Sequence, residues 1–245
     1  MIRIAAVGDV HLDEDLRGRV RAGLTRLGEE ADVLLLAGDL TRHGTLREAA
    51  VVVDEFRDLP VPVVAVLGNH DYHSDVQDGI HRLLASAGIH VLEGEAVRIP
   101  IAGAVLGVAG VKGFGLGFAG RCGSDFGEPE MKAFVRHGRR SASSLLAALR
   151  TIGDADVRVA LTHYAPVEDT LEGEPREIWP FLGSHLLAEA VDEAGAHLAV
   201  HGHAHAGSER GLTPGGVPVR NVAMPVIRTP YAVYCVRPTS GPGSC

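Results

Sequence analysis

The sequence predicts an α/β fold in which mixed β-sheets are covered by helices on the outside. Three short apolar runs alternate with segments of helical periodicity as far as residue 88, and apolar runs without helices between them follow. The 245 residues are enough for one large hydrophobic core, so a second independent domain is not required. Because apolar residues make up 46% of the chain and aromatic residues only 4%, we expect an aliphatic core.

The first part of the chain has the pattern of a βαβαβα series. Strands are expected where the apolar residues are continuous, at residues 2–7, 33–37 and 63–67. Helices are expected where apolar residues recur every three or four positions, at residues 16–27, 46–56 and 80–87. Thr45 and Glu48 form a capping-box pattern at the start of the second helix, and Gly88 is a typical residue to end the third.

The remainder of the chain predicts more strands than helices. Strands are expected near residue 91 and at 97–99, 105–111, 157–161, 197–200, 217–222 and 231–236, and helices at 129–149 and 184–194. The glycine-rich segment 112–130 is expected to form a flexible loop or lid. We expect a single domain over residues 1–237 and a flexible tail over residues 238–245.

Composition and charge argue against several classes of protein. The formal net charge is −8 and the pI is near 5.9, whereas a broad nucleic-acid interface usually requires a basic surface. The N-terminus lacks signal-peptide architecture, and the longest apolar stretch, residues 101–111, is too short and glycine-rich to cross a bilayer. We therefore expect a cytoplasmic protein without a membrane or nucleic-acid partner.

Cys122, Cys235 and Cys245 form no CxxC pair, which argues against a zinc ribbon or a disulfide framework.

Polar residues that can bind metal follow five of the predicted strands. They form the clusters Asp9-x-His11, Gly38-Asp39, Gly68-Asn69-His70-Asp71, Thr162-His163 and Gly202-His203-x-His205. Because open α/β sheets bind ligands beyond the carboxyl ends of their strands, we expect these clusters to meet at one sheet edge. Each cluster alone is also a common turn composition, but five in succession at strand ends indicate one shared site.

The residue types indicate the chemistry that such a site would support. Carboxylate oxygen and imidazole nitrogen suit divalent ions such as Mn, Fe, Zn and Ni. One aspartate can bridge two ions, and ions about 3.5–4 Å apart can stabilise the entering and leaving oxygens at phosphorus and make hydroxide available near neutral pH. The glycines beside the ligands are expected to permit sharp backbone turns. The clusters therefore predict a dinuclear centre that hydrolyses phosphate esters.

These five clusters, in this order, resemble the calcineurin-like metallophosphoesterase superfamily, and the resemblance covers about residues 1–225. It implies a four-layer αββα sandwich with two divalent transition-metal ions at one sheet edge. It also implies that one ion is held by Asp9, His11, Asp39 and His205, and the other by Asp39, Asn69, His163 and His203. Asp39 would then bridge the ions, a metal-bridging hydroxide would attack phosphorus, and His70 would be the general acid, oriented by Asp71.

Departures from the family pattern narrow the expected substrate. Leu40-Thr41-Arg42 follows Asp39 in place of the acidic residue and arginine of the serine/threonine phosphatases, which also have Glu where this chain has Asp71. The lipid-A-pathway hydrolases typically have Arg where this chain has His70. The chain therefore resembles the small bacterial phosphodiesterases and phosphatases more closely, and the expected partner is a small phosphorylated substrate.

Two other functions are compatible with the same clusters. A nuclease is disfavoured by the acidic balance of the chain. A non-catalytic metal-binding scaffold of the same fold is disfavoured because every expected ligand and His70 are present.

The glycine pattern at 115–120 is followed by a segment with poor helix propensity, which disfavours a dinucleotide-binding loop. The basic run at 136–140 is typical of a solvated helix face, or alternatively of a rim that steers phosphate.

Overall fold

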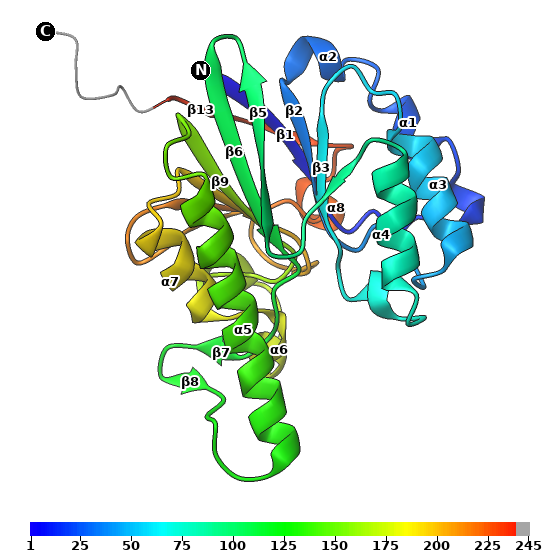
Figure 1. Cartoon of the computed structure of the whole chain (residues 1–245). Coiled ribbons are helices and arrows are strands. Elements are labelled where there is room, and N and C mark those ends of the chain that lie inside the picture. The colour runs from blue at the N-terminus through cyan, green and yellow to red at the C-terminus, as the bar shows by residue number, and fades with distance from the viewer. Residues whose placement is uncertain (239–245) are drawn as a thin grey trace, which may run out of the picture.

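The computed structural model describes residues 1–238 and contains two β-sheets that pack face to face between layers of helices (Figure 1). The first sheet has the order β13-β1-β2-β3-β4, formed by Ala232–Val236, Ile2–Val7, Val33–Ala37, Val63–Val66 and His90–Val91. The second has the order β11-β12-β10-β9-β6-β5, formed by Arg210–Leu212, Pro218–Asn221, Leu198–His201, Val157–Thr162, Ala104–Val111 and Glu95–Ile101. Apart from residue 238, the predicted tail lies outside the described residues.

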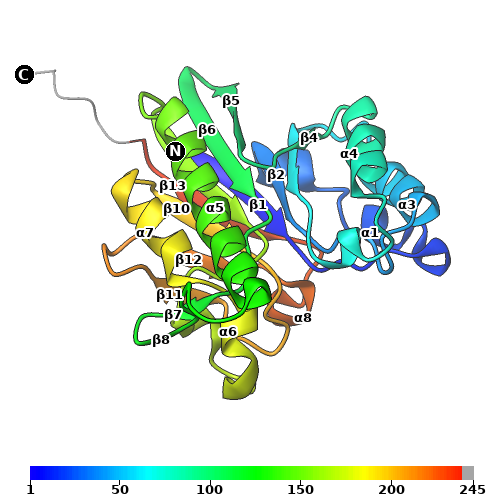
Figure 2. The same ribbon diagram turned by 60° about the horizontal axis from the view of Figure 1, so that its bottom comes forward.

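The helices are divided between the outer faces of the two sheets (Figures 1 and 2). Those beside the first sheet are α1 (Arg19–Ala22), α2 (Leu27–Glu30), α3 (Leu46–Phe56) and α4 (Gln77–Ser86). Those beside the second sheet are α5 (Pro129–Thr151) and α7 (His185–Glu193). Single turns form α6 (Trp179–Leu182), α8 (Met224–Ile227) and the 3-10 turns η1 (Glu14–Leu16), η2 (His70–Tyr72), η3 (Glu168–Leu171) and η4 (Arg176–Ile178). No helix among residues 1–238 is both long and apolar enough to span a membrane.

Apolar side chains fill the three interfaces between the four layers. Leu35 of the first sheet and Val159 of the second belong to the buried cluster between the sheets. The neighbouring Leu34 points the other way and packs with Phe56 of α3. Leu145 of α5 belongs to the cluster on the outer face of the second sheet. The expected four-layer αββα sandwich with an aliphatic core is therefore confirmed.

The parallel strands of both sheets end at the same edge of the sandwich. Strands β1 to β4 run parallel in the first sheet, and β6, β9, β10 and β12 run parallel in the second. Hydrogen bonds join the two sheets there: the Gly8 amide donates to the Val222 carbonyl (2.8 Å), and His163 Nδ1 donates to the Ala37 carbonyl (2.8 Å). This joint edge carries all five polar clusters.

The helix expected over residues 16–27 is wrong. The structure has η1, α1 and α2 in that segment, with turns between them. Gly18 adopts a left-handed φ of 82°, which interrupts a continuous helix. The Glu55 carboxylate accepts hydrogen bonds from the amides of Gly18 and Arg21, so α3 holds the irregular segment in place. The apolar residues at helical spacing in this segment do contact the core, but they belong to several short turns instead of a single continuous helix.

The glycine-rich segment 112–130 is more ordered in its first half than expected. Residues 112–118 are mostly buried, and the amides of Leu116 and Gly117 both donate to the Gly183 carbonyl (3.0 Å each). Strands β7 (Gly117–Phe118) and β8 (Arg121–Cys122), which were not predicted, pair as a hairpin. This hairpin and the first half of α5 project beyond the sheets (Figure 1). The predicted lid is therefore limited to residues 119–130, and its movement stays a prediction.

Candidate metal centre

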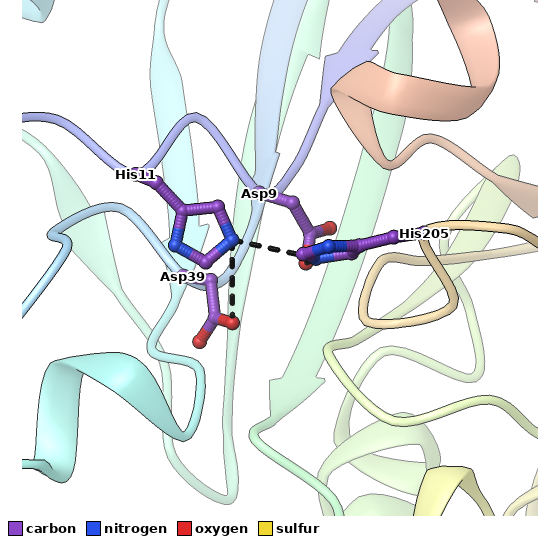
Figure 3. A group of neighbouring side chains, drawn as sticks. All are labelled: Asp9, His11, Asp39 and His205. Carbon is purple, nitrogen blue, oxygen red and sulfur yellow. Dashed lines mark hydrogen bonds and ion pairs between the residues drawn. The ribbon is translucent and has the colours of Figure 1, made fainter.

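Four side chains from three strand ends form a first group of possible ligands. They are Asp9 and His11 after β1, Asp39 after β2, and His205 after β10, and each offers a ligand atom within 4.8 Å of the others. His205 Nε2 lies 2.8 Å from Asp9 Oδ1. His11 Nε2 lies 3.3 Å from His205 Nε2 and 3.8 Å from Asp39 Oδ2. Figure 3 shows the two rings and two carboxylates pointing toward one another.

A second group lies on the other side of Asp39. It consists of Asp39, His163 after β9, and His203 after β10, again with ligand atoms within 4.8 Å of one another. His163 Nε2 lies 3.3 Å from Asp39 Oδ1 and 2.9 Å from Asn69 Oδ1, so the Asn69 side chain also faces this group. Asp39 is common to both groups, with one carboxylate oxygen toward each. All seven residues expected as ligands therefore lie together at this edge.

Four of the seven have a left-handed backbone. The φ angles are 56° at Asp9, 42° at His11, 50° at Asp39 and 71° at His203. This region costs a non-glycine residue about 1–2 kcal/mol, and such strain is typical of functional sites. Hydrogen bonds stabilise the turns: the Asp9 amide donates to the Gly38 carbonyl (2.9 Å), and the His11 amide donates to the Asp39 carbonyl (3.0 Å). The turns place these side chains directly beyond their strands.

Two glycines give the buried carboxylates room beside the backbone. A Cβ atom at Gly202 would lie 2.2 Å from Asp9 Oδ2, and one at Gly68 would lie 2.1 Å from Asp39 Oδ1. Neither glycine has a positive φ, so the expected sharp turn is not the reason for glycine at these positions. The missing side chain is the reason, because any larger residue would push the carboxylate out of the group.

The charge of the site fits divalent cations. Asp9 and Asp39 are 3% and 1% exposed, and their ion-pair partners within residues 1–238 are histidines, while the more distant Lys112 also attracts Asp39. Burial raises the pKa of Asp39, and the Asp9 carboxylate adds to this, while His163 opposes it. Burial also disfavours the Asp9 anion, but the hydrogen bond from His205 and the charge of His163 lower its pKa overall. Buried carboxylates of this kind are usually paired or coordinate metals.

Two of the histidines, His11 and His203, are favoured as neutral nitrogen donors. Burial lowers the pKa of His11 to about 4, against the opposing effect of Asp9, and burial lowers the pKa of His203 well below its usual value. His163 Nδ1 donates to a backbone carbonyl, so in the neutral ring Nε2 carries the lone pair that faces Asn69 Oδ1. Two acceptor atoms thus face each other, an arrangement that a cation between them would satisfy. The donor set therefore fits a divalent metal ion.

His70 lies at the rim of the first group. Its ring centroid is 4.5 Å from that of His11, and its amide donates to Asp39 Oδ1 (2.8 Å). Its ring nitrogen Nδ1 donates to the Arg42 carbonyl (2.7 Å). This bond fixes the ring and leaves Nε2 as the nitrogen that can exchange a proton with a bound molecule.

Asp71 does not hold the His70 ring, and the expected orienting role is wrong. The buried Asp71 carboxylate accepts hydrogen bonds from the Leu40 amide (3.2 Å), the Thr41 amide (2.8 Å), the Thr41 hydroxyl (2.6 Å) and the Gly68 amide (2.8 Å). Successive side chains on a helical turn point in different directions, which is why Asp71 faces inward while His70 faces the rim. Asp71 therefore ties the loop after β2 to the loop after β3.

Lys112 lies beside the second group but belongs to none of the motifs. It is buried, and its Nζ is 5.1 Å from the centroid of Tyr164, whose ring is 4.3 Å from that of His203. Its carbonyl accepts hydrogen bonds from the amides of His163 (2.9 Å) and Tyr164 (3.1 Å). The chain has only one other lysine, Lys132, and this rarity is the signal in the sequence that could have drawn attention to Lys112.

The family model for calcineurin-like phosphoesterases matches residues 2–207, which is most of the chain. The protein therefore belongs to the calcineurin-like phosphoesterase family, and the resemblance carried by the five clusters is confirmed. No curated protein matches the chain.

Solved structures with the same fold are distant in sequence. Phosphopantetheinyl hydrolase from Mycobacterium tuberculosis has a TM-score of 0.68 at 15% identity, with 98% of each chain covered. GAP50, the anchor in the inner membrane complex of Plasmodium, has a TM-score of 0.53 at 12% identity, with 91% of this chain and 72% of that chain covered. A hypothetical protein from Thermus thermophilus has a TM-score of 0.51 at 18% identity, with 90% and 75% covered. At these identities the similarity shows the fold alone.

Proposed function

We propose that this protein hydrolyses a phosphomonoester or phosphodiester at a centre of two divalent transition-metal ions. Membership of the calcineurin-like phosphoesterase family supports phosphoester hydrolysis. The observation that carries the dinuclear proposal is the position of Asp39, whose Oδ2 faces His11 and whose Oδ1 faces His163, one residue from each group. A carboxylate with one oxygen toward each group is suited to bridge two ions.

The proposal gives each of the seven residues a role at one ion or both. Asp9, His11 and His205 hold the first ion, Asn69, His163 and His203 hold the second, and Asp39 is shared. Bound divalent ions would supply positive charge to phosphoryl oxygens and lower the pKa of water at the site. The left-handed turns and their hydrogen bonds keep the ligand atoms in place before any ion binds.

His70 is the proposed general acid, because its ring lies beside the first group and is fixed at Nδ1. A proton on Nε2 can pass to the leaving oxygen of the ester, which avoids release of an unstable alkoxide. Asp71 contributes indirectly, since it holds together the two loops that carry Asp39 and His70.

Two alternative functions have less support. A nuclease would need a surface that attracts nucleic acid, and the formal net charge of −8 does not favour one. A scaffold without catalysis is compatible with the fold, since the anchor protein GAP50 shares it. This chain, however, has all seven expected ligands at one edge with His70 beside them, which a scaffold does not require.

The similarity to phosphopantetheinyl hydrolase supports one particular substrate for testing. The two structures cover 98% of each other, so nearly all of this chain has a structural counterpart in that enzyme. We therefore include a phosphopantetheinyl ester beside a chromogenic monoester, a chromogenic diester and single-stranded DNA. The donor set does not select among Mn, Fe, Zn and Ni, so each metal is tested.

The experiment uses protein depleted of metal with a chelator and then supplied with each ion in turn. We expect close to two ions per chain by metal analysis, and hydrolysis of at least one small ester that depends on the added metal. Hydrolysis restricted to DNA would support the nuclease instead. Failure to retain any ion after metal supplementation would contradict the dinuclear proposal.

A further inference from the structure

Lys112 places a positive charge beside the metal centre, where the carboxylates of Glu93 and Asp39 attract it. The residue is 8% exposed, and within residues 1–238 its ammonium donates one hydrogen bond, to the Gly113 carbonyl (3.3 Å). An ammonium has three donors, so two of them have no protein acceptor there. The carboxylate of Glu93 bonds to the Lys112 backbone amide (3.0 Å) and not to its ammonium. Lysine is seldom buried unless its charge is paired, so this position requires an explanation.

Three aromatic rings surround the Lys112 ammonium. Its Nζ lies 5.0 Å from the centroid of Tyr72, 5.3 Å from that of Phe114 and 5.1 Å from that of Tyr164. Cation–π contacts hold a positive charge in place, but they do not satisfy its hydrogen-bond donors. The ammonium is therefore held in position, while two of its donors have no protein acceptor within residues 1–238.

The surrounding rings connect this charge to both sides of the proposed active site. Tyr72 ends the η2 turn that begins with His70. Tyr164 follows His163 in the chain, and its ring lies 4.3 Å from that of His203. The ammonium thus lies between the segment that carries the proposed acid and the second ligand group.

We propose that the Lys112 ammonium binds a phosphate oxygen of the substrate. This inference rests on the proposed function, because His70 and the two ligand groups define where the phosphoryl group binds. The lysine ammonium is a compact charge with three donors on a flexible stem, which can bind a phosphate oxygen as a point charge. The chain has 21 arginines and two lysines, so the lysine at this position is unusual for its composition.

The two lysines allow a direct test by NMR. In protein labelled with ¹³C-lysine, Lys112 and Lys132 each give one ε-methylene signal, and Lys132→Met assigns them. The zinc-loaded protein is titrated with inorganic phosphate, because zinc is diamagnetic. We expect the Lys112 signal to shift and saturate while the Lys132 signal remains in place. A Lys112 signal that does not move, or that moves no more than that of Lys132, overturns the proposal.

Kinetics of Lys112→Met provide a second test, with Lys132→Met as the matched control. Loss of a charged hydrogen bond to the substrate is expected to raise KM for the preferred ester about ten-fold or more, with metal content unchanged. The phosphate inhibition constant should rise in parallel, whereas Lys132→Met should leave both constants unchanged. A purely structural lysine would instead lower the melting temperature without a selective change in KM, and that result contradicts the proposal.

The outcomes separate this inference from the proposed function. If the wild-type protein hydrolyses no ester but the Lys112 signal still saturates with phosphate, the hydrolytic proposal fails and the anion site stands. If the wild-type protein hydrolyses an ester but Lys112→Met keeps the same KM and phosphate affinity, the anion site fails and the hydrolytic proposal stands.

Discussion

Asp39 and His163 face each other across the edge where the two sheets meet, with Oδ1 and Nε2 3.3 Å apart. Asp39 follows β2 of the first sheet, and His163 follows β9 of the second. The other oxygen of Asp39 faces His11, which follows β1. The packing of the sheets therefore makes one carboxylate common to two ligand groups, and the expected effects of several substitutions depend on this arrangement.

Replacement of Asp39 should disrupt both proposed metal sites together. We expect Asp39→Ala to retain less than one ion per chain by metal analysis and to lose activity, because each group loses a carboxylate oxygen. Asp75→Asn, which changes an exposed carboxylate, is the control. Full occupancy by two ions in Asp39→Ala would show that Asp39 is not the bridge.

Replacement of His70 should reduce catalysis without loss of metal. General acids contribute about 10²–10⁴-fold to turnover, so kcat of His70→Ala should fall by that order for an ester with a poor leaving group. The loss should be smaller for a nitrophenyl ester, whose leaving group needs little protonation. His73→Ala changes an exposed histidine just after the same turn and should be neutral. Equal losses for good and poor leaving groups would remove His70 from the acid role.

Asp71 should act on stability and metal retention and not directly on proton transfer. Asp71→Asn replaces one acceptor oxygen by an NH₂ donor that would face the groups now donating to Asp71. We therefore expect the free energy of unfolding to fall by about 2 kcal/mol or more. Thr41→Val removes the hydroxyl that donates to Asp71 and accepts from the Gly44 amide (3.2 Å), and should lower the free energy of unfolding by about 1–2 kcal/mol. Chemical denaturation measures both changes. An Asp71→Asn protein with wild-type stability but a shifted leaving-group dependence would restore the orienting role to Asp71.

Gly202→Ala should displace Asp9 from the first group. The new methyl group would lie 2.2 Å from Asp9 Oδ2, and the neighbouring Ala37 carbonyl, at 2.9 Å, leaves little room to relax. We expect weaker metal binding, measured by competition with a chelator. Gly138→Ala, whose methyl group would make ordinary contacts of 3.4 Å or more within α5, should be neutral or stabilise the protein by about 0.5–1 kcal/mol. Unchanged metal affinity in Gly202→Ala would show that Asp9 can relocate.

Glu48 should give a pH-dependent contribution to stability. Burial works to raise its pKa, but hydrogen bonds from His43 and Thr45 outweigh this effect and lower it below the ordinary 4.5. A carboxyl group whose pKa is lower in the folded than in the unfolded state stabilises the folded protein. This stabilisation is complete at pH values above the pKa of the unfolded state and is lost as the pH falls through the pKa of the folded state. Glu48→Gln should therefore have a lower free energy of unfolding than the wild type near pH 7, and the difference between the two proteins should shrink below about pH 4.5. A difference that is constant over this range would contradict the ionic contribution.

Local patterns predicted much of the fold but not all of it. The capping box of Thr45 and Glu48 is present at the start of α3, and the strands at residues 2–7 and 33–37 have the predicted bounds. The helix expected at 16–27 failed because Gly18 takes a left-handed conformation that side-chain periodicity does not reveal. The β7–β8 hairpin was missed because its strands have two residues each, too few for a periodic signal.

By itself, the sequence determined which residue types stand at the ends of its buried strands, and the resemblance of these clusters to a known family implied the seven ligands and His70. Apolar periodicity reports local backbone conformation and burial, so strand ends can be located from it. Only the tertiary structure decided which oxygen of Asp39 faces each ligand group and that Asp71 binds the loops and not His70. It also decided that Lys112 lies beside Tyr164, whose ring contacts His203. These relationships join segments from two sheets, and they depend on how the sheets pack, which no local pattern encodes.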